Sequence, residues 1–182
     1  MKRPTILLIA ALFALYGASP ALAQNSATDY RDEIMRHFEN SSRKMTSLSE
    51  AVPADKYAWA PGEDVFSIAR VYAHIARYNF YYPETALGIP APEGIDVENI
   101  ESMTDKEQIR EILQRSIEHI REHVNAMTEA DLTKETQLYG RTMPAWGVLT
   151  QLVSHMNEHV GQAVSYARMN DIVPPWSRQP NM

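Results

Sequence analysis

Three histidines combine residue type and spacing in a way that suggests chemistry. His155 and His159 stand four residues apart in a segment with helical periodicity, so both side chains lie on one helix face, one turn apart. His74 lies far upstream in another helical segment. Two imidazoles at this spacing and a third from a neighbouring helix can hold a divalent ion and leave one position open. We therefore predict a metal site of His74, His155 and His159, with zinc or nickel as the ion; a chance surface pair is the alternative for His155 and His159.

The other histidines have different surroundings. His119 and His123 share the four-residue spacing, but charged residues flank them, so we expect both on a solvated surface, and His37 as well. His74 instead lies among apolar residues. Burying an imidazole without a partner costs about 1–3 kcal/mol, so we expect His74 to have either a hydrogen-bond partner in the core or a metal ion.

Helical periodicity predicts four helices that position these side chains. They are expected at about 28–48, from 64 or 67 to Pro83, from 104 to about 127, and from about 142 to the Pro174–Pro175 pair. Thr104 and Glu107 have the spacing of a capping box, and Thr142–Pro144 is expected to open the last helix. No segment alternates like a strand for long. The fold class is therefore all-α, a four-helix bundle.

The connections between these helices are long, about a dozen residues each, whereas bundle loops usually have about two to eight. Connections of this length can roof a cavity at one end of the bundle. The proline- and glycine-rich stretch from Gly88 to Gly94 is the expected lid or rim.

The first 23 residues have the pattern of a cleaved signal peptide. A short basic start precedes an apolar run, and Ala21-Leu22-Ala23 fits a signal-peptidase site. We expect cleavage after Ala23, an exported protein in the periplasm or secreted, and a single domain from 24 to 182. The apolar run is short for a membrane span, so no stable membrane anchor is expected after cleavage.

Composition narrows the function classes further. The chain has no cysteine, which excludes disulfides, thiolate ligands and a cysteine nucleophile. Its formal net charge is −6, and it has no basic run, so nucleic acid is not an expected partner. The expected partners are a small-molecule substrate and a second copy of the chain. Surface aromatics could serve a homodimer or anchor loops; the candidates are Tyr57, Trp59, Tyr81 and Tyr82.

Other metal-site patterns fit less well. No glutamate stands three residues before any histidine, which excludes the di-iron bundle pattern. His155–His159 matches the H-x-x-E-H string of inverted zinc peptidases, but Asp171 is the only acidic residue after it, and those enzymes need a downstream glutamate ligand. A b-type haem with histidine or methionine ligands stays open.

The sequence resembles the DinB/YfiT-like superfamily over about residues 28–176. The similar segments are Val71–Asn79, Leu152–Gln162, Tyr166–Asn170 and Ile172–Trp176. Members are four-helix bundles with a three-histidine metal site, so the resemblance implies His74, His155 and His159 as ligands. It also implies that Gly161 allows close helix packing and that Gln162 stays near the site.

The resemblance implies a metal-dependent hydrolase or transferase that acts on a small molecule. Some members are S-transferases or isomerases that use low-molecular-weight thiols, which an oxidising compartment holds in small amounts. A three-imidazole ion would lower the pKa of a water ligand towards about 7. The alternative is a non-catalytic exported four-helix binding or scaffold protein with a structural or vestigial metal site.

Four residues are candidates for a catalytic or substrate-binding role beside the ion. Glu158 is a weak candidate for general base, because it is adjacent to His159 in sequence and points about 100° away around the helix. Tyr78, Gln162 and Tyr166 are candidate substrate contacts, and packing is their alternative role.

Overall fold

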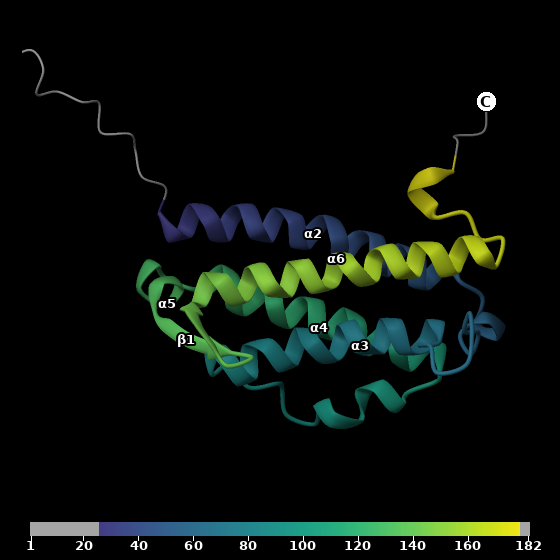
Figure 1. Ribbon diagram of the computed structural model, residues 1–182, viewed down its shortest axis with the longest axis horizontal. Coiled ribbons are helices and arrows are strands. Elements are labelled where there is room, and N and C mark those ends of the chain that lie inside the picture. Colours follow the sequence, from purple (N-terminus) through teal and green to yellow (C-terminus); the bar gives the residue numbers. More distant parts are fainter. Residues whose placement is uncertain (1–25, 179–182) are drawn as a thin grey trace, which may run out of the picture.

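Four long helices form the framework of the protein (Figure 1). The computed structural model describes residues 26–178, and the expected signal peptide lies outside these residues. The long helices are α2 (Ala27–Ala51), α3 (Ile68–Tyr82), α4 (Lys106–Ala126) and α6 (Ala145–Met169). This arrangement confirms the predicted all-α four-helix fold. No helix within 26–178 is long and apolar enough to span a membrane.

Side-chain caps set where three of these helices begin. Ser26 and Asp29 form a capping box at the start of α2, and the Ser67 hydroxyl accepts from the Arg70 amide at the start of α3. The capping box predicted at Thr104 is wrong. The residue after it, Asp105, is the N-cap of α4 and accepts from the Gln108 amide at 2.9 Å. Aspartate is at least as good an N-cap as threonine, because its carboxylate also favours the positive helix end.

A β-hairpin precedes the last helix, and its second strand covers the residues predicted to open that helix. Strand β1 (Glu135–Leu138) pairs antiparallel with β2 (Arg141–Pro144), after the short helix α5 (Glu129–Thr133). The prediction that Thr142–Pro144 opens the last helix is therefore wrong: these residues pair with β1, and α6 begins at Ala145. Tyr139 and Gly140 form the turn with φ of 53° and 73°, as a type I′ hairpin turn requires.

Two connections hold short helical turns that bear on the predicted lid. A π-helical turn, η2 (Pro83–Leu87), continues α3 until Gly88 ends it with φ of 70°. The turn η3 (Val97–Ser102) then packs against α3. Gly88 borders a cavity of about 540 Å³, so this stretch does form a rim. That cavity is lined by the end of α4 and by β1, and none of the three predicted ligands lines it.

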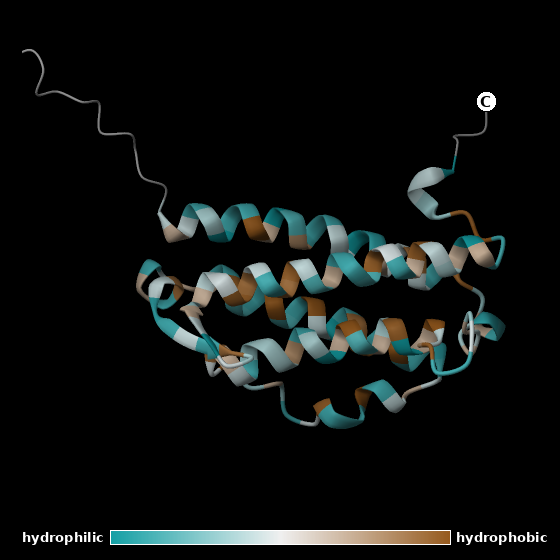
Figure 2. Cartoon of the chain, in the orientation of Figure 1, coloured by the Kyte–Doolittle hydropathy of each residue, from teal (hydrophilic) through white to brown (hydrophobic). Residues whose placement is uncertain are grey.

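The core lies between the four helices, and each of them contributes buried apolar side chains to it. Figure 2 shows that hydrophobic and hydrophilic residues are interspersed along the helices. Helix α6 packs against α2 and α3, and α4 packs against α3 and α2. Tyr57 and Tyr82 are each 1% exposed, so neither is available as a surface aromatic for a partner. The contact between α3 and α6 matters most for function, because it brings His74 next to the pair on α6.

Candidate metal centre

Helices α3 and α6 bring His74, His155 and His159 together. The Nε2 atom of His155 lies 3.1 Å from Nε2 of His74 and 3.2 Å from Nε2 of His159. One nitrogen from each ring lies within 4.8 Å of the others, and within the described residues this is the only such group of three potential ligands. The i, i+4 spacing in α6 supplies two rings, and the α3–α6 contact supplies the third.

The hydrogen bonds on the far side of two rings fix where their protons lie. Nδ1 of His74 is 2.8 Å from the Glu101 carboxylate, which only accepts, so this nitrogen carries the proton. Nδ1 of His159 donates to Oε1 of Gln162 at 2.8 Å, and the Gln162 amide donates to the Tyr166 hydroxyl at 2.8 Å. In the neutral tautomer that these bonds select, each of the two rings presents an unprotonated Nε2 towards His155.

This arrangement leaves the three inner nitrogens without a full set of partners. Two Nε2 lone pairs face Nε2 of His155, which has at most one proton to give. At most one of the two short contacts can therefore be a full hydrogen bond, and the other holds two nitrogens close together without a proton directed between them, which is unfavourable. A cation among the nitrogens removes the conflict. Zinc–nitrogen bonds of about 2.0–2.1 Å at tetrahedral angles need nitrogens about 3.3–3.4 Å apart, close to the distances present.

The environment favours the neutral, metal-binding form of His155 and His74. Burial, helped by the charges of His159 and His74, lowers the pKa of His155 to about 3. Burial also lowers the pKa of His74, and the Glu101 carboxylate opposes this only in part. Burial alone would raise the pKa of Glu101, but the bonds from His74 and Arg70 outweigh it and lower the pKa. Near neutral pH the pair is thus a carboxylate beside a neutral imidazole.

Glu101 is the residue of this centre that sequence reasoning missed. It lies in η3 and reaches across to α3, where Arg70 binds it at 3.2 Å and Arg77 lies 3.9 Å away. A carboxylate that orients a ligand imidazole is a recurring feature of metal sites. The side chains of His74 and Glu101 are only 14% and 18% exposed, so water screens their contact weakly.

The four residues predicted to act on a substrate or proton near the ion have different surroundings. Tyr78 packs against both His74 and His155, with ring centroids 4.5 Å away in each case. Gln162 holds His159, as described above, and Tyr166 is buried and packs edge-on against Trp59. Glu158 is exposed.

Gly161 does not have the expected packing role. A Cβ atom built at this position meets nothing within 4 Å, and the residue is exposed. The side of α6 that carries Gly161 faces solvent rather than a neighbouring helix, so no close approach requires a glycine there.

The remaining histidines divide into surface and core. His37 is exposed, as predicted. The prediction for His119 is wrong: it is 4% exposed and packs against Phe80 and His123. Neither of its ring nitrogens has a hydrogen-bond partner among residues 26–178. Nδ1 of the partly exposed His123 lies 3.0 Å from the His119 carbonyl oxygen and donates to it.

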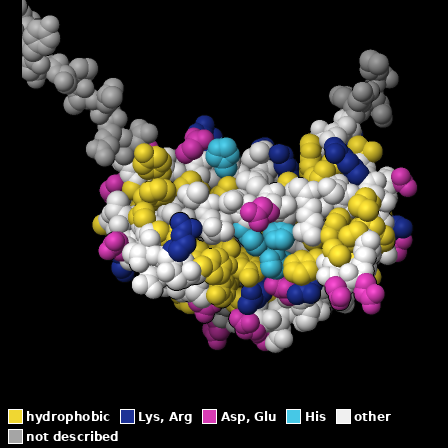
Figure 3. Space-filling view, in the orientation of Figure 1, with side chains coloured by type: hydrophobic (Ala, Val, Ile, Leu, Met, Phe, Trp, Pro, Cys, Tyr) yellow, Lys and Arg dark blue, Asp and Glu magenta, His cyan; other side chains and the backbone are white. Residues whose placement is uncertain are grey.

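The centre opens on one face of the bundle. Figure 3 shows histidine side chains gathered in the middle of this face, with hydrophobic side chains on either side. Aromatic side chains flank the three histidines on two sides. Phe66 packs on His74 at 5.2 Å, and Tyr82 lies 5.7 Å from His155. An ion held by the three rings would therefore have an accessible position between aromatic walls.

Comparison with solved structures shows the same fold in other proteins. A DinB-like protein from Bacillus cereus is 17% identical with a TM-score of 0.66, covering 79% of this chain and 95% of its own. A DinB-like protein from Bacillus subtilis is 20% identical, with a TM-score of 0.54 and coverage of 82% and 99%. A mycothiol-dependent maleylpyruvate isomerase is 13% identical, with a TM-score of 0.58 and coverage of 76% and 62%.

Sequence comparison assigns the family. No curated protein matches the sequence significantly. The family model of the DinB superfamily matches residues 37–163, more than half of the chain and including all three candidate ligands. This chain therefore belongs to the DinB superfamily.

Proposed function

We propose that the protein is a metal-dependent enzyme, a hydrolase or transferase, that acts on a small molecule at the face between α3 and α6. The observation that carries this proposal is the convergence of three Nε2 atoms that share at most one proton, too few for both short contacts to be full hydrogen bonds. When bound there, a divalent ion such as zinc or nickel supplies a Lewis acid with one open coordination position. The isomerase among the similar structures supports an enzymatic role for this fold.

The surrounding residues have separable roles in this proposal. Glu101 and Gln162 hold the Nδ1 protons of His74 and His159, so that both rings turn Nε2 inward. The Tyr78 ring covers one side of the site, against His74 and His155, and limits the access of water. Glu158 is exposed, and no described residue holds it near the rings by a hydrogen bond or ion pair. We therefore assign the removal of a proton from the metal-bound group to solvent rather than to Glu158.

Metal analysis of the purified protein tests the binding step. We expect one zinc or nickel ion per chain, and we expect His74→Ala to reduce this content at least tenfold. His37→Ala is the matched control, because His37 is exposed and far from the centre in the sequence. Unchanged metal content in His74→Ala would contradict the ligand assignment.

An activity screen tests the enzymatic step separately. Protein stripped with a chelator and protein reloaded with zinc or nickel are compared on nitrophenyl esters, phosphoesters and thiol acceptors. We expect turnover of at least one class in the reloaded protein alone. Metal binding without turnover of any class would support the non-catalytic alternative, in which the ion stabilises the bundle.

We also propose that the chain is exported and cleaved after Ala23. The cap of α2 begins at Ser26, so cleavage would leave every described helix intact. Mass spectrometry of the protein from the expressing cells tests this proposal. A mature N-terminus at Gln24 in the exported fraction is expected, and full-length protein confined to the cytoplasm would contradict it.

A further inference from the structure

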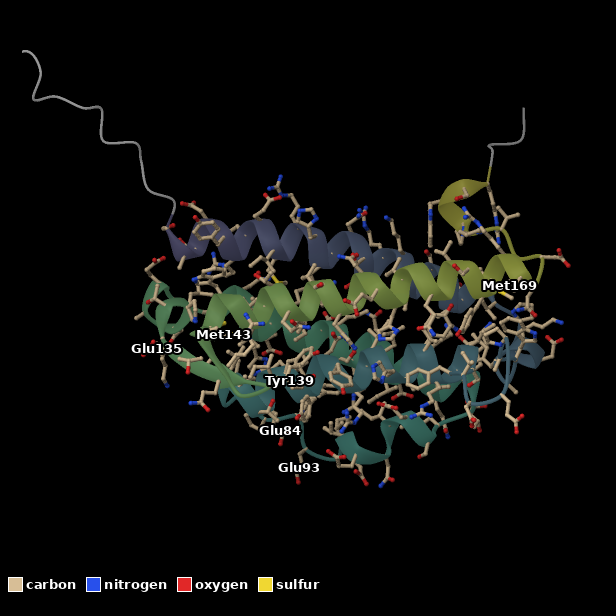
Figure 4. The ribbon with its side chains drawn as sticks, in the orientation of Figure 1. Glu84, Glu93, Glu135, Tyr139, Met143 and Met169 are labelled. Atoms are coloured by element: carbon tan, nitrogen blue, oxygen red, sulfur yellow. The ribbon has the colours of Figure 1, made fainter. Side chains whose placement is uncertain are left out.

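The hairpin between α5 and α6 brings an exposed tyrosine to the edge of the candidate metal centre. Tyr139 stands at the tip of the hairpin (Figure 4), and its ring lies 6.0 Å from that of Tyr82, edge to face. Tyr82 in turn lies 5.7 Å from the ring of His155. Tyr139 is 61% exposed, yet its hydroxyl donates to the Tyr82 hydroxyl at 3.2 Å.

The backbone at Tyr139 has a conformation that a tyrosine seldom adopts. Its φ of 53° lies in the left-handed region, where a tyrosine is less stable than the asparagine or aspartate that such turns favour. Strained residues of this kind cluster at ligand-binding sites. The hairpin does not need a tyrosine here, because β1 and β2 pair through their backbones.

The hydroxyls of Tyr139 and Tyr82 can exchange the roles of donor and acceptor, which frees the Tyr139 proton for a ligand. Tyr82 is 1% exposed, and burial raises its pKa, so it keeps its proton. Its hydroxyl accepts from Tyr139, and a hydrogen bond with the Gln151 side chain also lowers its pKa, against the larger effect of burial. If the Tyr139 proton rotates towards a ligand, the Tyr82 proton can fill the same contact in the reverse direction. No heavy atom has to move.

We propose that Tyr139 is a substrate-contacting residue, which donates a hydrogen bond to a carbonyl oxygen a few bonds away from the atom that ligates the metal. Tyr82 is the positioning residue that supports it. The distance follows from the geometry, since one tyrosine ring separates Tyr139 from His155. This inference rests on the proposed function, because it needs an ion at the three histidines.

The acceptor is uncharged in this proposal. The pair is neutral, because burial raises the pKa of both hydroxyls. A ketone, ester or amide carbonyl oxygen accepts a hydrogen bond from such a neutral hydroxyl.

The test uses cobalt-loaded protein and two hydroxamates that both ligate the ion. Acetohydroxamate ends at its ligating group, whereas the hydroxamate of succinamic acid carries an amide carbonyl three bonds further on. Changes in the visible spectrum of cobalt report binding without any turnover. We expect Tyr139→Phe to weaken the longer hydroxamate about three- to tenfold, the range of one neutral hydrogen bond. Tyr82→Phe should weaken it less, and neither variant should change acetohydroxamate more than about twofold.

Tyr81→Phe is the matched control, because Tyr81 packs against Tyr78 and Tyr82 without a hydroxyl contact to the pair. It should change neither affinity. The inference is overturned if Tyr139→Phe leaves both affinities unchanged, or weakens both hydroxamates equally while circular dichroism shows an intact fold. Failure of the unaltered protein to bind cobalt would instead overturn the proposed function, and this inference with it.

Discussion

Replacing Glu101 should weaken metal binding although Glu101 touches no metal in the proposed site. Its carboxylate accepts from Nδ1 of His74 at 2.8 Å, and the two side chains are 18% and 14% exposed. A hydrogen bond to a charged acceptor contributes about 1.5–3 kcal/mol, and loss of such a partner typically costs about 10- to 100-fold in metal affinity. We expect Glu101→Ala to lose about 100-fold and Glu101→Gln about tenfold, because the amide oxygen can still accept.

Competition with a chromophoric chelator measures these affinities in the stripped protein. Glu98→Gln is the matched control: Glu98 also lies in η3 and binds Arg77 at 3.1 Å, but its side chain is 77% exposed and it contacts no histidine. We expect this control to bind zinc like the unaltered protein. The reasoning is refuted if Glu101→Ala retains full affinity, or if Glu98→Gln loses as much as Glu101→Gln.

Two further predictions concern residues outside the ligand set. His119→Leu should stabilise the protein by about 1–3 kcal/mol, because it removes a buried imidazole without partners. Burial and the charge of His123 lower the pKa of His119, so the unfolded chain binds the proton first and stability falls as the pH drops below about 6.5. Urea unfolding at pH 7 and pH 5 should therefore show a smaller loss of unfolding free energy in the variant than in the unaltered protein. An equal loss would contradict this. Gly161→Ala should raise the unfolding free energy by about 0.5–1 kcal/mol with unchanged zinc affinity, since the site is helical, exposed and open; a destabilised variant would show that the glycine has a packing role.

The ligand set could be predicted from the sequence because the i, i+4 spacing in a helix is a local rule. His155 and His159 follow from that rule directly, and His74 follows from an imidazole in an apolar helix that must find a partner. Glu101 could not be found in this way. It lies 27 residues from His74, in a turn without helical periodicity, and only the docking of η3 on α3 brings the two together.

The errors in the fold have similar physical causes. The charges around His119 suggested a surface, but α4 packs against both α2 and α3, so its buried face is wider than one apolar stripe. The hairpin was missed because each strand has only four residues, too few to show alternation. Its turn contains Tyr139-Gly140 in place of the asparagine-glycine that usually marks such hairpins.

Anomalous diffraction from crystals of zinc-loaded protein would test the central claim most directly. The three-histidine site predicts one ion per chain, about 2.0–2.1 Å from Nε2 of His74, His155 and His159, with Nδ1 of His74 still bonded to Glu101. An ion bound elsewhere, or bound to His155 and His159 without His74, would contradict it.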